Sequence, residues 1–312
     1  MSEVKHEVLL QAKGIYKNFE TSKKDQAVHA LTNVDLTLYR GETLALVGES
    51  GCGKSTLGRT LIRMLPATRG SVTFEGQNIT AMKDKEFAPL RRRMQMVFQD
   101  PYASLDPRMK VRDIIAEPLE TYHVCKTKAE TTHRVLELMQ AVGVPAEFLN
   151  RYPHQFSGGQ RQRIGIARAL IVEPEFIIAD EPISALDMSI RAQVLNLLRH
   201  LQKERGITYL FIAHDLSVMR YISDRIAVIH KGDIVELADA EELVTHAIHP
   251  YTRSLLSAIP MPNPRLERKK KLLVYDPAMH DYTQEAPQWR ELRPSHWVLC
   301  SEQESKDWLA EM

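Results

Sequence analysis

The chain has 312 residues, of which 44% are hydrophobic and 26% are charged, so its composition is that of a globular protein and excludes a disordered chain or a disulfide-rich miniprotein. Its 41 basic and 40 acidic residues give a formal net charge of +1, and nucleic-acid binding would therefore need a local basic patch. Its apolar runs are far shorter than the roughly 20 residues of a membrane-spanning helix. The start of the chain lacks the apolar segment of a signal peptide, so we expect a cytosolic protein of one or two domains.

The first third of the chain has the pattern of strands followed by a helix. Alternating or continuous apolar residues predict strands over 8–10, 34–38 and 43–47. From Lys54 the apolar residues recur at helical spacing until about residue 65. Residues 71–79 alternate around a Glu-Gly pair and predict a hairpin, and residues 94–98 predict a further strand.

The middle of the chain alternates between helices and buried strands. Residues 101–153 are rich in helix formers and predict a helical insertion. Helices are then expected over about 160–171 and 189–205, the second ended by Gly206, and strands over 176–179 and 208–213. Strands that alternate with helices predict a largely parallel sheet with helices on both faces.

The pattern weakens from about residue 241, where prolines become frequent, and this part is predicted to be an appendage. A basic run over 265–271 could face anionic lipid, although a solvated linker is the simpler interpretation of so short a run. The three cysteines, Cys52, Cys125 and Cys300, are far apart and form no C-x-x-C pair, so we expect reduced thiols.

A glycine-rich loop lies between the predicted strand 43–47 and the predicted helix that begins at Lys54. Residues 48–55, Gly-Glu-Ser-Gly-Cys-Gly-Lys-Ser, have the form G-x-x-x-x-G-K-[ST]. Glycines permit a tight turn whose N–H groups face a phosphate chain, and the following helix start adds partial positive charge. Lys54 would neutralise the β and γ phosphates, and Ser55 would bind Mg²⁺. The nucleotide-binding residues predicted here are Gly48, Glu49, Ser50, Gly51, Cys52, Gly53, Lys54, Ser55 and Thr56.

Two carboxylates follow the buried strand 176–179. Asp180 and Glu181 lie at its carboxyl end, the edge at which ligands bind in sheets of this kind. Asp180 would hold Mg²⁺, and Glu181 would polarise the attacking water. Together with the phosphate loop, these acids predict a nucleotide-hydrolysing site.

The segment Phe156-Ser-Gly-Gly-Gln160 gives a serine and two glycines at a helix start, where N–H groups and a hydroxyl can meet an anion. With the following residues to Leu170, it resembles the signature sequence of the ATP-binding subunits of ABC transporters, with Phe156 where leucine is most frequent. The resemblance covers roughly residues 8–260. It implies that two such subunits pair head to tail, so that Ser157, Gly158, Gly159 and Gln160 complete the ATP site of the partner.

The resemblance implies roles for four further residues. Tyr16 would stack on adenine, Gln99 would reach Mg²⁺ and the attacking water, and His214 would contact the γ-phosphate. Asp187, in the Ser-Ala-Leu-Asp loop that begins at residue 184, would cross the dimer interface. The catalytic set implied by the resemblance is Glu181, His214 and Gln99, and the Mg²⁺ set is Ser55, Gln99 and Asp180, with ATP and Mg²⁺ as cofactors.

The family also implies the architecture. We expect an α/β fold with a P-loop NTPase (RecA-like) core, an antiparallel β subdomain, an inserted α-helical subdomain and a C-terminal extension. The corresponding segments are 1–100 for the core with the β subdomain, 101–156 for the helical subdomain, 157–240 for the remaining core and 241–312 for the extension.

Two segments narrow the resemblance to the oligopeptide and dipeptide importers: residues 249–260, beginning His-Pro-Tyr-Thr, with Pro262 and Pro264 after them, and residues 99–107. The nickel and glutathione importers share this pattern, so they stay an alternative. Many relatives carry a cysteine cluster after this segment, whereas only Cys300 is present here, so no iron–sulfur cluster is expected.

The resemblance implies a peripheral protein on the cytoplasmic face of the cell membrane. Its implied partners are a second ABC ATPase subunit, two transmembrane permease subunits and an extracytoplasmic peptide-binding protein. A soluble ABC-type ATPase that acts on nucleic acid is a less favoured alternative, because the chain has neither a long coiled-coil insertion nor a second cassette.

Overall fold

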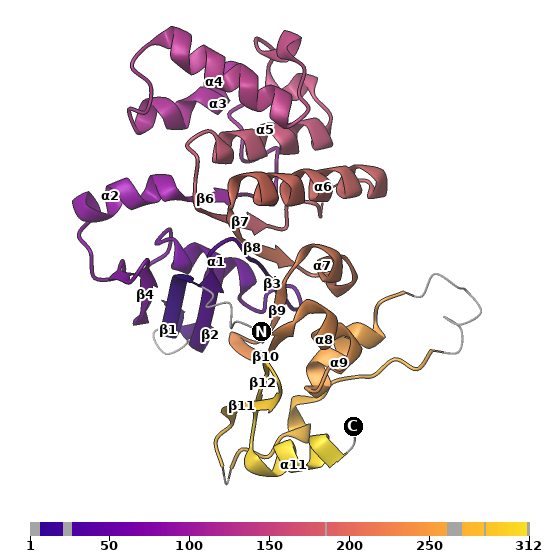
Figure 1. Cartoon of the computed structure of the whole chain (residues 1–312). Coiled ribbons are helices and arrows are strands. Elements are labelled where there is room, and N and C mark those ends of the chain that lie inside the picture. Colours follow the sequence, from indigo (N-terminus) through magenta and orange to yellow (C-terminus); the bar gives the residue numbers. More distant parts are fainter. Residues whose placement is uncertain (1–6, 21–26, 185, 261–269, 284, 311–312) are drawn as a thin grey trace, which may run out of the picture.

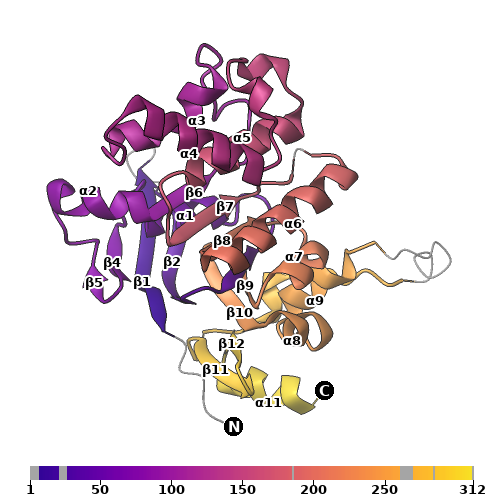
Figure 2. The same ribbon diagram turned by 45° about the horizontal axis from the view of Figure 1, so that its top comes forward.

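The computed structural model describes residues 7–20, 27–184, 186–260, 270–283 and 285–310, and it contains two sheets (Figures 1 and 2). The smaller sheet has the spatial order β2 (Ala27–Tyr39), β1 (Val8–Glu20), β4 (Arg69–Phe74) and β5 (Gln77–Asn78). The larger has the order β11 (Gln288–Arg293), β12 (His296–Cys300), β10 (Asp233–Asp239), β9 (Arg225–His230), β3 (Thr43–Val47), β8 (Thr208–Ala213), β7 (Phe176–Asp180) and β6 (Met94–Val97).

Helices cover these sheets and form a separate layer at one end of the molecule. In chain order they are α1 (Lys54–Leu61), α2 (Asp84–Arg93), α3 (Val111–Thr121), α4 (Lys128–Ala141), α5 (Gly158–Leu170), α6 (Met188–Arg205), α7 (Leu216–Ile222), α8 (Ala240–Thr245), α9 (Pro250–Ser257) and α11 (Glu302–Ala310). In the described part of the chain, no helix combines the length and the apolar character needed to cross a bilayer.

Five consecutive strands of the larger sheet, β9, β3, β8, β7 and β6, run parallel and end at the edge strand β6. Every residue of β3, β7 and β8 is buried, as expected for strands covered on both faces. Successive side chains point to opposite faces, so Leu44 and Leu46 enter one hydrophobic core while Ala45 and Val47 enter the other. This parallel arrangement confirms the sequence prediction.

The two faces of the sheet are covered differently. One face packs against α6 and α7, which contribute Val194 and Leu216 to its core. The other packs against α1 together with the small antiparallel sheet, which contribute Leu57 and Ile15. Helices therefore cover both faces as predicted, and the antiparallel β subdomain that the resemblance implies shares one of these faces with α1.

The helical insertion is present as predicted. Helices α3 and α4 pack against α5, and Figure 1 shows these three helices together at one end of the molecule. Their shared core includes Ile114, Val135 and Ile166. The helix that carries the signature sequence is thereby tied to the insertion as well as to the central sheet.

Several predicted boundaries match the structure closely. Strands β3 and β8 have the predicted ends, and Gly206 ends α6 with a left-handed φ of 65°. The hairpin predicted over 71–79 is formed by β4 and β5. The hairpin of β9 and β10 and the helix α2 were not predicted.

The C-terminal residues do not form a separate appendage. Strands β11 and β12 pair antiparallel and continue the larger sheet beyond β10. They alternate only partly in hydrophobicity, and His296 occupies an inward position, which explains why residue patterning did not reveal them. Pro262, Pro264 and residues 265–269 of the basic run lie outside the described residues.

Candidate functional site

The glycine-rich loop connects β3 to α1 at the carboxyl end of the parallel strands. Gly53 caps α1 with a φ of 107°, and a β-carbon there would lie 2.5 Å from the Ala30 carbonyl oxygen of β2. A larger residue at position 53 would therefore collide with backbone. The loop is held close to β2 by this small residue.

Lys54 begins α1 and is 5% exposed. Its Nζ donates hydrogen bonds of 2.7 Å to the carbonyl oxygens of Gly48 and Glu49. The ammonium group therefore lies inside the curve of the loop, where a phosphate chain would meet it. Of the remaining loop residues, Cys52 is buried and burial raises the pKa of its thiol, while Glu49, Ser50 and Gly51 are exposed and Ser55 and Thr56 are half-buried.

Asp180 ends β7 and approaches the start of α1. The Ser55 Oγ donates a hydrogen bond of 2.7 Å to Asp180 Oδ1, and the Arg59 guanidinium lies 3.7 Å from Asp180 Oδ2. Burial raises the pKa of Asp180, against the opposing effects of the Ser55 hydrogen bond and the Arg59 charge. The serine and the aspartate predicted to hold Mg²⁺ are therefore in direct contact.

Glu181 follows Asp180 and adopts a left-handed φ of 45°, which is uncommon for a residue with a side chain. Its N–H donates to the Ile212 carbonyl of β8 at 3.0 Å, which fixes this backbone. Gln99 Nε2 donates to Glu181 Oε2 at 2.7 Å, and His214 Nδ1 lies 3.7 Å from the same oxygen. The three predicted catalytic side chains therefore meet at one carboxylate.

The loop after Glu181 leads to the exposed Asp187, which is the N-cap residue of α6. Ser184 Oγ donates to the Glu181 carbonyl at 3.0 Å. Arg191 donates to the carbonyls of Leu186 at 2.8 Å and Ser184 at 3.3 Å. These bonds tie the segment that carries Asp187 to the backbone of Glu181.

The signature segment begins α5 as predicted. The exposed Ser157 accepts from the Gln160 N–H at 3.4 Å, and Gln160 Oε1 accepts from the Ser157 N–H at 3.1 Å, forming a capping box. A β-carbon on Gly159 would lie 2.5 Å from Ile190 Cγ2, so α5 starts close against α6. In the described parts of the chain, no hydrogen bond or ion pair joins residues 157–160 to residues 48–56.

Tyr16 lies in β1 where the pairing with β2 is irregular, and its side chain is half-buried. Lys17, its neighbour, pairs with Leu31 of β2, and Leu31 Cδ2 would lie 3.2 Å from a β-carbon on Gly53. Tyr16 therefore comes from the sheet that packs along the phosphate loop, although no side-chain hydrogen bond joins it to the loop among the described residues.

Sequence reasoning missed three residues that position this site. Arg59 follows Ser55 by one helical turn, a spacing that could have identified it beside Asp180. Arg191 could not be found by spacing, because it acts on a loop that precedes its own helix. Tyr251, in the His-Pro-Tyr-Thr segment of α9, accepts a hydrogen bond of 3.0 Å from the Glu49 N–H of the phosphate loop.

Comparison with known families and proteins gives matches over most of the chain. The ABC transporter family matches residues 31–184, and the family described as the C-terminal region of oligopeptide/dipeptide transporters matches residues 235–284. The oligopeptide transport ATP-binding protein OppF of Bacillus subtilis is 57% identical over 96% of this chain and 98% of its own length. The oligopeptide transport protein AmiF of Streptococcus pneumoniae is 55% identical, and the dipeptide transport protein DppF of Lactococcus lactis is 51% identical, each over 96% of both chains.

Two solved structures of ABC proteins are also similar to this chain. A dimeric ATP-binding cassette, MJ0796, in a post-hydrolysis state with ADP and Pi is 30% identical, covers 74% of this chain and 99% of its own, and has a TM-score of 0.69. The protein cbiO1 of Clostridium perfringens, part of an ABC transporter complex, is 26% identical over 84% of this chain and 98% of its own, also with a TM-score of 0.69.

Proposed function

The chain belongs to the ABC transporter family, as its motifs predicted, and from this premise we propose that it is the ATP-hydrolysing subunit of an importer for oligopeptides or dipeptides. The observation that carries the proposal is a pair of contacts at the carboxyl end of β7: Ser55 with Asp180, and Gln99 with Glu181. These contacts support a site in which the phosphate loop, an acidic metal ligand and a base would share one edge of the sheet.

ATP would be held by the N–H groups of residues 48–56 and by the ammonium of Lys54, with adenine stacked on Tyr16. The hydroxyl of Ser55, the carboxylate of Asp180 and the amide oxygen of Gln99 form the all-oxygen donor set that suits Mg²⁺. Bound there, Mg²⁺ would neutralise charge on the phosphates. Asp180 and Ser55 already lie 2.7 Å apart, so little rearrangement is needed to bring them to one ion.

Glu181 would accept a proton from the attacking water. The Gln99 amide holds one carboxylate oxygen of Glu181, and the Ile212 carbonyl holds its backbone, so the base has a fixed direction. His214 is largely exposed beside that carboxylate and would contact the γ-phosphate.

Two surfaces of this chain would serve different nucleotides. Ser157 and Asp187 are exposed N-cap residues of α5 and α6. Among the described residues, neither they nor residues 158–160 bond to the chain's own phosphate loop, which favours their use by a second ABC ATPase subunit. Four hollows of about 430 to 750 Å³ lie elsewhere on the molecule, and none of the four is lined by residues 48–56. An open phosphate loop suits a site that a partner closes.

The remaining proposed partners are two transmembrane permease subunits and an extracytoplasmic peptide-binding protein, with this chain peripheral on the cytoplasmic face of the membrane. A hollow of about 530 Å³ lies where the core strand β6 meets the insertion helix α3, and it is lined by polar and apolar side chains such as Gln95, Glu117 and Tyr122. A permease segment seated there would receive motion from Gln99 through the insertion.

Reconstitution tests the proposal. The chain, its partner ATPase and the two permeases are placed in liposomes with the peptide-binding protein, and uptake of peptide, Ni²⁺ and glutathione is compared. We expect ATP-dependent uptake of peptide alone, and uptake of only Ni²⁺ or glutathione would contradict the peptide assignment.

Lys54→Ala should reduce uptake at least about 100-fold because it removes the charge that binds the phosphates. The exposed Lys128→Ala is the matched control and should leave uptake unchanged.

A further inference from the structure

The phosphate loop is hydrogen-bonded to two residues that lie about 200 positions further along the chain, in the β9–β10 turn and in α9. The Glu49 N–H donates to the Tyr251 hydroxyl at 3.0 Å, and the Gly232 N–H donates to the Cys52 carbonyl at 2.9 Å. Gly232 belongs to the turn between β9 and β10, and Tyr251 belongs to α9. The loop that would bind ATP is therefore held by hydrogen bonds from a part of the chain that is distant in sequence.

The side chain of Tyr251 is held in a fixed position by its neighbours. Its side chain is 1% exposed, and its ring lies 4.2 Å from the His230 ring and 5.3 Å from the Tyr275 ring, measured between centroids. Its own N–H donates to Nδ1 of His249, the N-cap residue of α9, at 3.1 Å. A ring packed on this many sides has one available orientation, so its hydroxyl is presented to Glu49 rather than to solvent.

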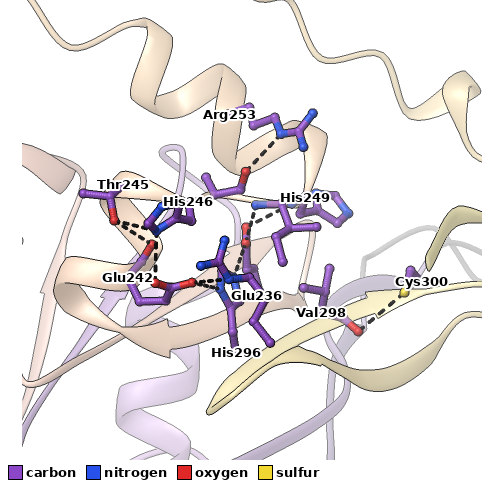
Figure 3. Close-up of polar contacts among 12 residues, drawn as sticks. Glu236, Glu242, Thr245, His246, His249, Arg253, His296, Val298 and Cys300 are labelled. Carbon is purple, nitrogen blue, oxygen red and sulfur yellow. Dashed lines mark hydrogen bonds and ion pairs between the residues drawn. The ribbon is translucent and has the colours of Figure 1, made fainter. Parts of the chain in front are cut away.

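The start of α9 is itself held by a buried pair from the antiparallel strands. Glu236 of β10 accepts from the Ile248 N–H at 2.7 Å and from the His249 N–H at 3.3 Å. His296 of β12 lies 2.7 Å from Glu236, and both side chains are fully buried. Figure 3 shows Glu236 between His296 and His249, with dashed contacts to each side.

These contacts form one connected series from β12 to the phosphate loop. His296 holds Glu236, Glu236 holds the first turn of α9, and the Tyr251 hydroxyl in that turn holds the Glu49 N–H. We propose that Tyr251 is a positioning residue for nucleotide binding, and that the C-terminal part of the chain thereby sets the shape of the phosphate loop before ATP arrives. The inference rests on the proposed ATPase function.

The physical reason is preorganisation. A loop whose N–H groups already point in the bound directions loses less conformational freedom when phosphate binds. Without the hydroxyl, the Glu49 N–H would have no fixed acceptor, and the loop would sample other conformations. Binding of ATP would then have to restore the loop, so the KM for ATP should rise while the chemical step in the closed assembly changes little.

Tyr251→Phe in the assembled transporter tests this. It keeps the ring and removes only the hydroxyl that accepts from Glu49. We expect the KM for ATP to rise about threefold to tenfold, with kcat changed less than twofold, because one hydrogen bond of this kind has a net contribution of that order. Hydrogen exchange measured on the purified full-length chain should quicken in residues 48–53 and stay unchanged in β8.

Tyr275→Phe is the matched control. Its ring packs on Tyr251, but among the described residues its hydroxyl makes no hydrogen bond to the phosphate loop. It should leave both the KM and the exchange of the loop unchanged. Equal KM values for Tyr251→Phe and the unaltered transporter would overturn the inference, and so would equal shifts in the two variants, which would assign the effect to ring packing. Failure of the unaltered chain to bind Mg·ATP would instead overturn the proposed function.

Discussion

The two halves of the larger sheet are built on different principles. In the parallel half, β3, β7 and β8 are wholly buried, and apart from the terminal Asp180 and the first residues Thr43 and Thr208 their side chains are aliphatic or aromatic. In the antiparallel half, Glu236 in the middle of β10 and His296 at the start of β12 are fully buried. The first half buries hydrophobic surface and leaves its polar groups at strand ends, whereas the second buries a polar pair that has to be satisfied internally.

This difference separates the polar residues that would act on a ligand from those that hold the fold together. Polar groups at the ends of parallel strands face a ligand, as Asp180 and Glu181 do. Polar groups inside the antiparallel half face each other and the backbone of α9, and so they hold a neighbouring helix in place. Substitutions at the carboxyl ends of the parallel strands should change turnover, and substitutions of the polar groups inside the antiparallel half should change stability and its dependence on pH.

The largest effect is expected in the parallel half, from Glu181→Gln. The amide keeps the size of the side chain but cannot accept a proton from water, so turnover of the assembled transporter should fall about 10²- to 10⁴-fold. ATP binding should persist, and closed dimers should accumulate. Steady-state phosphate release and gel filtration with ATP measure the two outcomes.

Glu204→Gln on the exposed face of α6 is the control for the loss of one carboxylate. It should leave phosphate release unchanged. Normal turnover of Glu181→Gln would remove Glu181 from its proposed role and would also remove the chemical contrast between the two halves of the sheet.

The next largest effect is expected in the antiparallel half, from Glu236→Ala. The change leaves His296 and the Ile248 N–H without their buried acceptor, and loss of one partner of such a pair costs about 3 kcal/mol. All three tryptophans, Trp289, Trp297 and Trp308, lie in the C-terminal 25 residues, so their fluorescence reports on the environment of this part of the chain. Urea unfolding followed by fluorescence should shift to lower urea.

Glu241→Ala provides the comparison, because it breaks an exposed ion pair with Arg220 that solvent screens, so the urea midpoint should change little. Circular dichroism of the helices follows the rest of the chain. If Glu236→Ala moved the fluorescence transition no further than Glu241→Ala did, the buried pair would not support the antiparallel half.

The parallel half could be predicted from the sequence because each of its features is local. Continuous apolar residues define β3 and β8, a fixed spacing defines the phosphate loop, and Asp180 follows directly on its strand. The parallel sheet then brings Ser55 to Asp180, and its carboxyl edge is where Gln99 meets Glu181. The resemblance to the ABC family added the roles of Gln99 and His214, which spacing alone does not give.

The antiparallel half could not be predicted in the same way. Its strand β12 places His296 inward between exposed and half-exposed residues, so no apolar alternation marks it. The partner that makes an inward histidine acceptable, Glu236, is 60 residues away along the chain. Tyr251 was part of a segment noted for its resemblance, but its contact with Glu49 depends on the position of α9, which only the tertiary structure provides.

Acidification should distinguish the two halves further. Burial, with the neighbouring His280 and His230 charges, lowers the pKa of His249 from 6.5 to about 3. The unfolded chain therefore binds the proton first, and stability present above pH 6.5 is lost progressively as pH falls toward 3. Lowering the pH from 7 to 5 should cost the antiparallel half about 2 kcal/mol, measured as a lower urea midpoint of tryptophan fluorescence.

His249→Asn separates this titration from the capping role of the residue. Asparagine can accept the Tyr251 N–H at the start of α9 but does not titrate. The variant should lose most of the pH dependence between pH 7 and 5. An unaltered pH profile would assign the sensitivity to another buried group and would break the link between His249 and this half of the sheet.

The smallest effect is expected at the surface of the parallel half, from Glu175→Gln just before β7. Its carboxylate binds Arg93 at 2.5 Å and Arg40 at 2.8 Å, and these hydrogen bonds, Arg93 first, lower its pKa from 4.5 to about 2. The side chain is 33% exposed, so solvent screens the ion pairs and the loss should be about 0.5 to 1 kcal/mol at pH 7.

The stability that Glu175 contributes depends on pH over a different range from that of His249. A lowered carboxyl pKa gives stability that is present above pH 4.5 and is lost as pH falls toward 2, so the difference between Glu175→Gln and the unaltered chain should be constant from pH 7 to 5 and vanish near pH 2. Circular dichroism during urea unfolding measures it. Because His249 acts between pH 6.5 and 3 and Glu175 only below 4.5, acid should loosen the antiparallel half first. Simultaneous loss of fluorescence and helical signal at pH 5 would show that the two halves unfold as one unit.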